Sequence, residues 1–231
     1  DRPMRPLFPK DYRNDVTLNN MVMSVDPQCN PEVVAMLGSS IATCISDIPF
    51  DGPCAATQVG MIDGELIINP TLEQNAKSDL KLTVASTREK VIMIEAGANE
   101  VPEAKMIEAI FEADKVNKEI IAFIDKIVAD CGKAKHSYES CAVPEELFAA
   151  MKEIVTPEEM EVAVFSDDKQ TREENIRQVT AKLEEAFADN EEWLAVLGEA
   201  VYQYQKKTVR KMILKDHKRP DGRAITQIRS L

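Results

Sequence analysis

The chain has 231 residues, of which 5% are aromatic and 29% charged, and its formal net charge is −12 at pH 7. This length suffices for one large domain or two small ones. No apolar run is long enough to span a bilayer, so no transmembrane helix is expected, and the acidic balance argues against a nonspecific nucleic-acid coat. Five scattered cysteines without Cys-x-x-Cys spacing predict reduced thiols in a cytoplasmic protein.

The first part of the chain has the pattern of strands around one helix. Residues 15–25 form a β-rich run. Asn30 and Pro31 suit the start of a helix whose apolar face continues to Ile45. Asp63-Gly64 predicts a hairpin turn, and further strands are expected as follows: 58–62 and 65–69 on either side of that turn, then 80–85 and 91–96.

From Pro102 onward the spacing of apolar residues becomes helical. The first predicted helix stops at Gly132. Thr156-Pro157-Glu158-Glu159 is a capping box, and Asn190 suits the cap of a last helix that runs to about Lys215. The remaining helices are expected from Pro144 and over 168–188.

Charge is unevenly distributed along this second part. Residues 145–192 are strongly acidic, whereas 206–229 hold only two carboxylates, Asp216 and Asp221. A helical region with an acidic body and a basic end is therefore predicted. The basic end contains Lys206, Lys207, Arg210, Lys211, Lys215, Lys218, Arg219, Arg223 and Arg229.

Together these patterns predict an α+β fold in 1–135 and an all-α helical bundle in 140–215, followed by a short tail in 217–231. The chain has no initiator Met at Asp1 and lacks a signal-peptide pattern. We therefore expect it to begin inside a longer protein, and its sheet to rely on strands upstream of Asp1.

Residue patterns alone name no reaction. Arg2 and Arg5 lie in a proline-fixed segment and suit phosphate, or they are solvated arginines of an extended loop. A metal hydrolase using Asp47, Asp51 and Asp63 is an open alternative, although turn chemistry also explains the first two. A zinc site is conceivable but lacks a fourth ligand; its three candidates are Cys131, His136 and Cys141.

Seven short segments follow one another along nearly the whole chain: 1–9 (DRPMRPLFP), 12–15 (YRND), 46–53 (SDIPFDGP), 68–71 (INPT), 78–85 (SDLKLTVA), 93–97 (MIEAG) and 219–223 (RPDGR). In order and spacing they resemble the polynucleotide phosphorylase family. The resemblance implies two RNase PH-like cores joined by an all-helical domain. Residues 1–135 would be the C-terminal part of the first core, a mixed sheet with helices; 140–215 would be the helical linker, and 217–231 the first strand of the second core.

The resemblance also implies a chemistry and shows where this chain departs from it. The family degrades RNA, including messenger RNA, from its 3′ end as a nucleotidyltransferase. Inorganic phosphate attacks the terminal phosphodiester, nucleoside diphosphates are released, and Mg²⁺ offsets the charge. Two aspartates of the catalytic copy are matched here by Asn75 and Lys81, with Asp79 nearby, and its phosphate-binding serines by Asn30-Pro31-Glu32. This copy is therefore expected to be noncatalytic, with no catalytic residue and no metal ligand, and the isolated chain to be inactive.

The remaining role implied by the resemblance is to guide RNA and to build the assembly. Arg2, Arg5 and Arg13 are the candidates for contacts with the backbone of single-stranded 3′ RNA. The family implies a homotrimer and partners in RNA-degradation complexes. Asp11 stands where the family has Gly. A noncatalytic interaction module, whose acidic helices bind a basic partner, is the alternative function.

Overall fold

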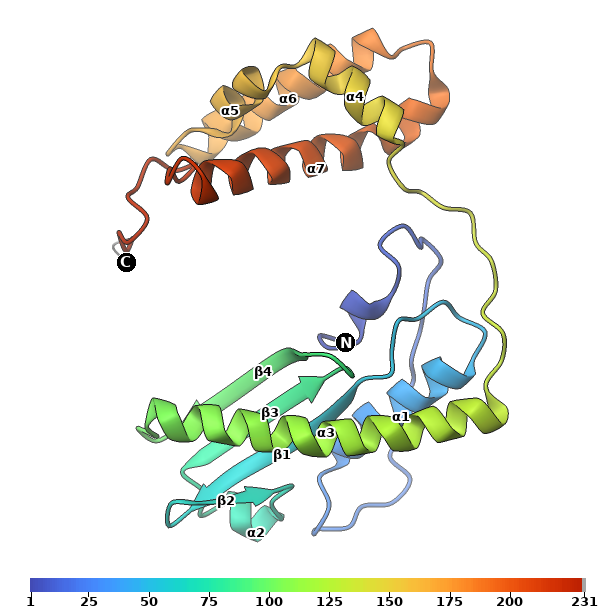
Figure 1. Ribbon diagram of the computed structural model, residues 1–231, viewed down its shortest axis with the longest axis vertical. Coiled ribbons are helices and arrows are strands. Elements are labelled where there is room, and N and C mark those ends of the chain that lie inside the picture. Colours follow the sequence, from blue (N-terminus) through green and yellow to red (C-terminus); the bar gives the residue numbers. More distant parts are fainter. Residues whose placement is uncertain (230–231) are drawn as a thin grey trace. The chain divides into compact units, whose positions relative to one another are not determined.

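The computed structural model describes residues 1–229, and the chain divides into two compact units, Asp1–Ser140 and Cys141–Leu231 (Figure 1). The first unit contains a sheet with helices and the second is helical, so the predicted α+β class followed by an all-α region is confirmed. No helix in the described part of the chain is long and apolar enough to cross a membrane.

The first unit is a four-stranded sheet with strand order β2-β1-β3-β4. All three strand pairings are antiparallel, so residues 1–229 supply no parallel pair to this sheet. The predicted Asp63-Gly64 turn connects β1 to β2, and both of its residues have positive φ. The strands are β1 (Ala55–Ile62), β2 (Glu65–Ile68), β3 (Leu80–Ser86) and β4 (Val91–Ala98).

Helices α1 (Pro31–Ile45) and α3 (Glu103–Cys131) pack against β1, and α3 also packs against β3 (Figure 1). The unit also contains a short helix, α2 (Leu72–Asn75), and a 3-10 turn, η1 (Arg5–Leu7). Burial of apolar side chains between α3 and the sheet drives this packing. The buried cluster consists of Val59, Met61, Leu80, Leu82, Val84, Ala109 and Ala113.

A small polar network is buried between α3 and the sheet. The Thr57 hydroxyl donates to Asn117 Oδ1 (2.8 Å), and Asn117 Nδ2 donates to the Val84 carbonyl (3.0 Å) and to Ser86 Oγ (3.2 Å). Asn117, Thr57 and Ser86 are fully buried. Since a buried polar group without a partner is costly, this network fixes the register of α3 on the sheet.

The strand predicted over residues 15–25 is wrong. This segment has no regular secondary structure, and most of its apolar side chains are exposed, with Met21 and Met23 at 81% and 84%. A strand is stabilised by pairing with a neighbour, and none of the four described strands pairs with this segment. The residues of this segment are of types that favour strands, but none of the described strands pairs with them.

Within residues 141–229 the second unit contains four helices around one core: α4 (Glu145–Ile154), α5 (Pro157–Val164), α6 (Lys169–Ala186) and α7 (Glu191–Leu214). The predicted capping box is present, since the Thr156 hydroxyl accepts from Glu159 N and the Glu159 carboxylate accepts from Thr156 N. Asn190 caps α7 as predicted, and Asp168 caps α6.

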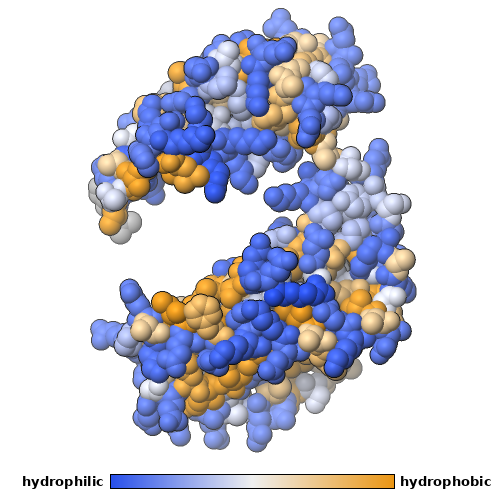
Figure 2. Space-filling view, viewed as in Figure 1, coloured by the Kyte–Doolittle hydropathy of each residue, from blue (hydrophilic) through white to orange (hydrophobic). Residues whose placement is uncertain are grey.

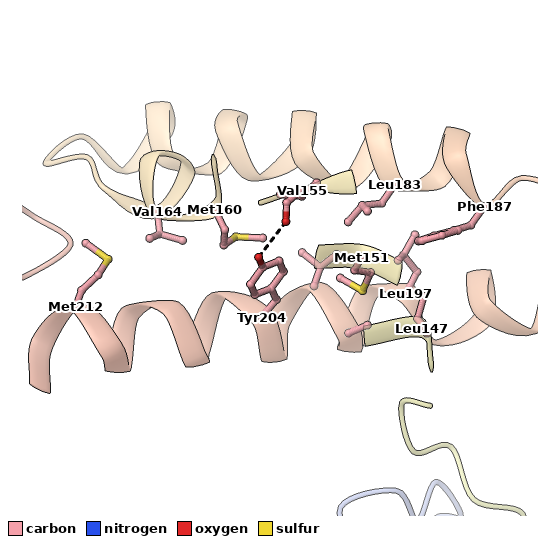
Figure 3. Packing of buried hydrophobic residues seen from close by; sticks show 12 residues of the cluster. Leu147, Met151, Val155, Met160, Val164, Leu183, Phe187, Leu197, Tyr204 and Met212 are labelled. Carbon is pink, nitrogen blue, oxygen red and sulfur yellow. Dashed lines mark hydrogen bonds between the residues drawn. The ribbon is translucent and has the colours of Figure 1, made fainter. Parts of the chain in front are cut away.

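The buried core of the second unit contains three leucines, three methionines and three valines, together with Phe187, Ala200 and Tyr204 (Figure 3). Leu147, Met151, Met160 and Leu183 are completely buried. At its centre the Tyr204 hydroxyl donates a hydrogen bond to the Val155 carbonyl, at 2.9 Å. Val155 ends α4, so this bond ties the α4–α5 junction to α7.

The strand expected over 217–231 is not formed within residues 217–229, which contain turns, and 230–231 lie outside the described residues. The turn is held locally, because Asp221 accepts hydrogen bonds from Arg223 and Arg219. The hydrogen bond from Arg223 lowers the pKa of Asp221 to about 2. As with 15–25, no described strand pairs with this segment.

Candidate functional site

A cleft of about 600 Å³ lies where the first residues of the chain meet the start of α1 and the middle of the sheet. Gln58 on β1, Thr83 on β3 and Glu95 on β4 stand opposite one another in the ladder and all line this cleft. Asp1, Arg2, Glu32 and Lys81 complete its polar lining. The antiparallel register thus brings side chains from distant parts of the sequence to one place.

The N-terminus of α1 is closed by the chain's own side chains. Asn30 Oδ1 accepts from Glu32 N (2.8 Å), and Asn30 Nδ2 donates to Gln58 Oε1 (2.7 Å). Gln58 Nε2 in turn donates to the Glu32 carboxylate (3.4 Å). A helix N-terminus attracts anions, but here Glu32 already supplies the negative charge. A phosphate at this position would be repelled by that carboxylate.

Asn75 and Lys81 stand at the positions where the resemblance led us to expect metal-binding aspartates, and they are not the carboxylates that Mg²⁺ prefers. Lys81 lines the cleft with a cationic side chain. Asn75 ends α2 outside the cleft lining, with Nδ2 donating to the Pro70 carbonyl (3.3 Å), and Asp79 accepts from Asn99 (3.4 Å). Within residues 1–229 no three His, Cys, Asp or Glu side chains gather into a cluster that could hold a metal ion.

The three candidate arginines lie in different surroundings. Arg2 lines the cleft and forms an exposed ion pair with Glu95 (3.1 Å). Arg5 is paired with Asp1 (2.8 Å) and lines an adjoining cleft of about 800 Å³ beside α1. Arg13 lines neither cleft, and its Nη1 donates to the Lys10 carbonyl (2.5 Å). The structure therefore places Arg2 and Arg5 at neighbouring clefts and Arg13 apart from them.

Asp11 has a partner set that the sequence did not reveal. Its carboxylate accepts hydrogen bonds from the Tyr138 hydroxyl (3.0 Å) and from Ser140 Oγ (2.5 Å). These bonds, the one from Ser140 first, lower the pKa of Asp11. Tyr12 packs edge-on against Tyr138 with ring centroids 5.0 Å apart. The loop that follows Arg2 and Arg5 is thus attached to the last residues of the first unit.

The segment after α3, which contains Lys135 and Tyr138, also closes the C-terminus of α1. Lys135 Nζ donates to the carbonyls of Thr43 (3.1 Å), Cys44 (2.9 Å) and Ser46 (2.6 Å). A cation at a helix C-terminus satisfies carbonyls that lack intrahelical partners and offsets the helix dipole. No local pattern could have predicted these contacts, since they join residues about 90 positions apart.

Comparisons with known proteins match regions of both structural units. Residues 52–116 match the family described as "3′ exoribonuclease family, domain 2", and residues 146–224 match "Polyribonucleotide nucleotidyltransferase, RNA binding domain". The two matched regions fall in the first and second structural units respectively.

Curated relatives match over the whole chain. The chain is 74% identical to the polyribonucleotide nucleotidyltransferase of Lachnoclostridium phytofermentans, 48% to that of Ruminiclostridium cellulolyticum and 45% to that of Caldicellulosiruptor saccharolyticus. It spans 33% of the length of each of these relatives. A crystal structure of rice (Oryza sativa) Rrp46 overlaps 46% of this chain and 51% of its own with 14% identity and a TM-score of 0.41, a likeness too low to define the fold.

Proposed function

This chain belongs to the polyribonucleotide nucleotidyltransferase family, and we propose that it is the noncatalytic first-core and linker region of a phosphorolytic 3′-to-5′ exoribonuclease. The complete enzyme would use inorganic phosphate and Mg²⁺, both bound outside this chain, to release nucleoside diphosphates from RNA. The observation that carries the proposal is the charge of two side chains that line the cleft. Glu32 and Lys81 both line the cleft, and an anionic side chain at the start of α1 and a cationic one on β3 support the absence of a phosphate site and a Mg²⁺ site there.

The contribution of the first unit to RNA would be guidance rather than chemistry. Arg2 and Arg5 are held by exposed ion pairs, with side chains 64% and 77% exposed. Such pairs contribute only about 0–1 kcal/mol, so an RNA phosphate can replace Glu95 or Asp1 as partner. Contacts of this kind add affinity without sequence preference. Arg13 would contribute from a position outside the two clefts.

The wider assembly follows from the family rather than from this chain. We include in the proposal a homotrimer in the cytoplasm, with further partners in RNA-degradation complexes. Figure 2 shows apolar surface over α3 and the neighbouring strands. Phe111 and Phe123 on α3 are 61% and 56% exposed, which is suitable for a subunit contact.

The test is an assay of ADP release from poly(A) in the presence of phosphate and Mg²⁺. The 231-residue chain is measured beside the full-length L. phytofermentans relative. Activity in the relative alone would support the proposal. ADP release by the chain itself would contradict the noncatalytic assignment of the cleft, and inactivity in both would favour the alternative of an acidic helical interaction module.

A further inference from the structure

Residues 132–140, which follow α3, have no regular secondary structure, yet they are bound at several points to the rest of the first unit (Figure 1). We call these residues the strap. The strap ends at Ser140, where the first unit also ends, and α4 begins at Glu145. How firmly the strap is held therefore determines how much of the chain between α3 and α4 can move.

The near end of the strap is fixed beside the C-terminus of α1. Lys133 N donates to the Ile45 carbonyl (3.0 Å), and His136 N donates to the Asp47 carbonyl (2.8 Å). Lys135 Nζ adds its three hydrogen bonds to carbonyls at that helix end. Because backbone groups of the strap take part, this end does not depend on a single side chain.

The far end of the strap is fixed by side chains that meet at Asp11. Tyr138 Oη (3.0 Å) and Ser140 Oγ (2.5 Å) both donate to its carboxylate. The ring of Tyr12 packs edge-on against Tyr138, and the Tyr12 hydroxyl lies 3.3 Å from His136 Nε2. The hydrogen bond from Ser140, above all, lowers the pKa of Asp11, so the acceptor is ionised at neutral pH. Hydrogen bonds to an ionised acceptor are stronger than those between neutral groups.

Asp11 lies in a turn over residues 9–12 that is itself held in place. The turn is closed by Tyr12 N, which donates to the Pro9 carbonyl (3.1 Å). Just before the turn, Phe8 packs against Phe50 with ring centroids 4.9 Å apart. The other three residues of the turn line the cleft of about 800 Å³ beside α1. One carboxylate thus joins the wall of this cleft to the strap.

We propose that Asp11 works as a latch for the strap: it fixes residues 138–140 to the first unit, so that the connection to the second unit begins only after Ser140. Without this carboxylate, residues 137–140 would join that connection. Because the reach of a flexible chain grows with its length, the second unit would then move more freely. The latch also transmits any movement of the turn at the cleft wall to the strap.

Proteolysis of the native 231-residue chain with chymotrypsin tests the latch, because Tyr138 lies within the strap. Asp11→Ala removes the carboxylate, and Asp11→Asn keeps one oxygen acceptor. Asp15→Ala, which removes an exposed aspartate nearby, is the matched control. The sequence around Tyr138 is the same in all variants, so the rate of cleavage after Tyr138 reports how often the strap opens. Mass spectrometry identifies and quantifies the fragments.

We expect Asp11→Ala to raise the rate of cleavage after Tyr138 by roughly 5- to 20-fold, because two hydrogen bonds to a carboxylate no longer oppose opening. Asp11→Asn should be cut at an intermediate rate, and Asp15→Ala like the parent chain. Phe111 and Phe123 are exposed but lie within α3, so cleavage after them requires this helix to unfold and should not change.

Three results would overturn the inference. The first is an unchanged rate after Tyr138 in the Asp11→Ala chain. The second is an equal rise in the Asp15→Ala chain. The third is an equal rise after Phe111 and Phe123, because the whole first unit would then be unfolding and not the strap alone.

The effect on the second unit is measured by time-resolved fluorescence anisotropy of Trp193. This residue is the only tryptophan and packs against the core of the second unit. Asp11→Ala should shorten its slow rotational correlation time, and Asp15→Ala should leave it unchanged. Faster cleavage without a shorter correlation time would overturn the claim that the latch limits the second unit. Neither measurement involves RNA, so both outcomes are independent of the phosphorolysis assay.

Discussion

Some cationic side chains of the two units differ in whether they have a partner. In the first unit, Arg2, Arg5 and Arg88 are paired with carboxylates, and Lys135 donates to three carbonyls. In the second, the cations at the end of α7 have no such partners among the described residues. The Arg88 pair and the Lys135 contacts thus hold segments of the first unit in place, whereas the cations at the end of α7 have no described carboxylate partner.

In the cleft of the first unit, polar side chains likewise have partners within the unit. The polar groups at the start of α1 satisfy one another through Asn30, Gln58 and Glu32. A site whose donors and acceptors are already paired internally gains little by binding a ligand. These internal pairs leave little for a phosphate to bind at the start of α1.

The largest expected effect tests whether the two units are independent. Leu147→Ala in the second unit and Leu82→Ala in the first each delete a completely buried side chain and should destabilise their own unit by about 2–5 kcal/mol. Trp193 is the only tryptophan and lies on α7, so its fluorescence during urea unfolding reports the second unit. L147A should shift that transition and L82A should leave it in place. A shift of the Trp193 transition by L82A would show that the units unfold together.

A smaller effect is expected from the buried polar network of the first unit. Asn117→Ala leaves Thr57 and the Val84 carbonyl without their partner and should lower the free energy of unfolding by about 1–3 kcal/mol. Urea unfolding followed by circular dichroism measures the loss in the first unit. Asn99→Ala, at an exposed asparagine, is the control and should change little. If N117A were as stable as the parent chain, the network would not fix α3 on the sheet.

In the second unit, Tyr204→Phe removes the hydrogen bond to the Val155 carbonyl. Burial raises the pKa of the Tyr204 phenol, which is consistent with a neutral donor. The loss should be about 0.5–1.5 kcal/mol in the Trp193 transition. Tyr202→Phe changes an exposed tyrosine in the same helix and should leave that transition unchanged. A loss in Y202F equal to that in Y204F would contradict the assignment.

The smallest effect is a dependence of stability on pH. The hydrogen bond from Thr156 N, and then the one from Lys182, lower the pKa of Glu159 below its ordinary value of 4.5. A carboxylate whose pKa is lowered by folding stabilises the fold above its unfolded pKa, and this stabilisation is lost as the pH falls through the folded value.

Acidification below about pH 5 should therefore weaken the second unit, and Glu159→Gln should make this decrease shallower. Urea midpoints of the Trp193 transition over a series of pH values measure the effect. Glu158→Gln, which removes a neighbouring carboxylate outside the capping box, should keep the steeper decrease. Identical pH profiles for E159Q and the parent chain would contradict the role of the cap.

The sequence by itself determined most of the local structure. The hairpin at Asp63-Gly64, the capping box at Thr156 and the cap at Asn190 are formed by neighbouring residues, so short patterns were enough to predict them. The basic end of α7 was equally visible, because exposed charges on one helix require only its period of 3.6 residues.

Only the tertiary structure decided the long-range contacts. The β-rich residues 15–25 could not show that no described strand would pair with them. Neither could the sequence show that Asp11 would accept from Tyr138 or that Lys135 would close α1. These contacts join residues that are distant along the chain, and their geometry exists only once the sheet and helices have packed. Whether a charged side chain has a partner also depends on the fold. The sequence therefore showed the cations of α7, but only the structure showed that they lack carboxylate partners among the described residues.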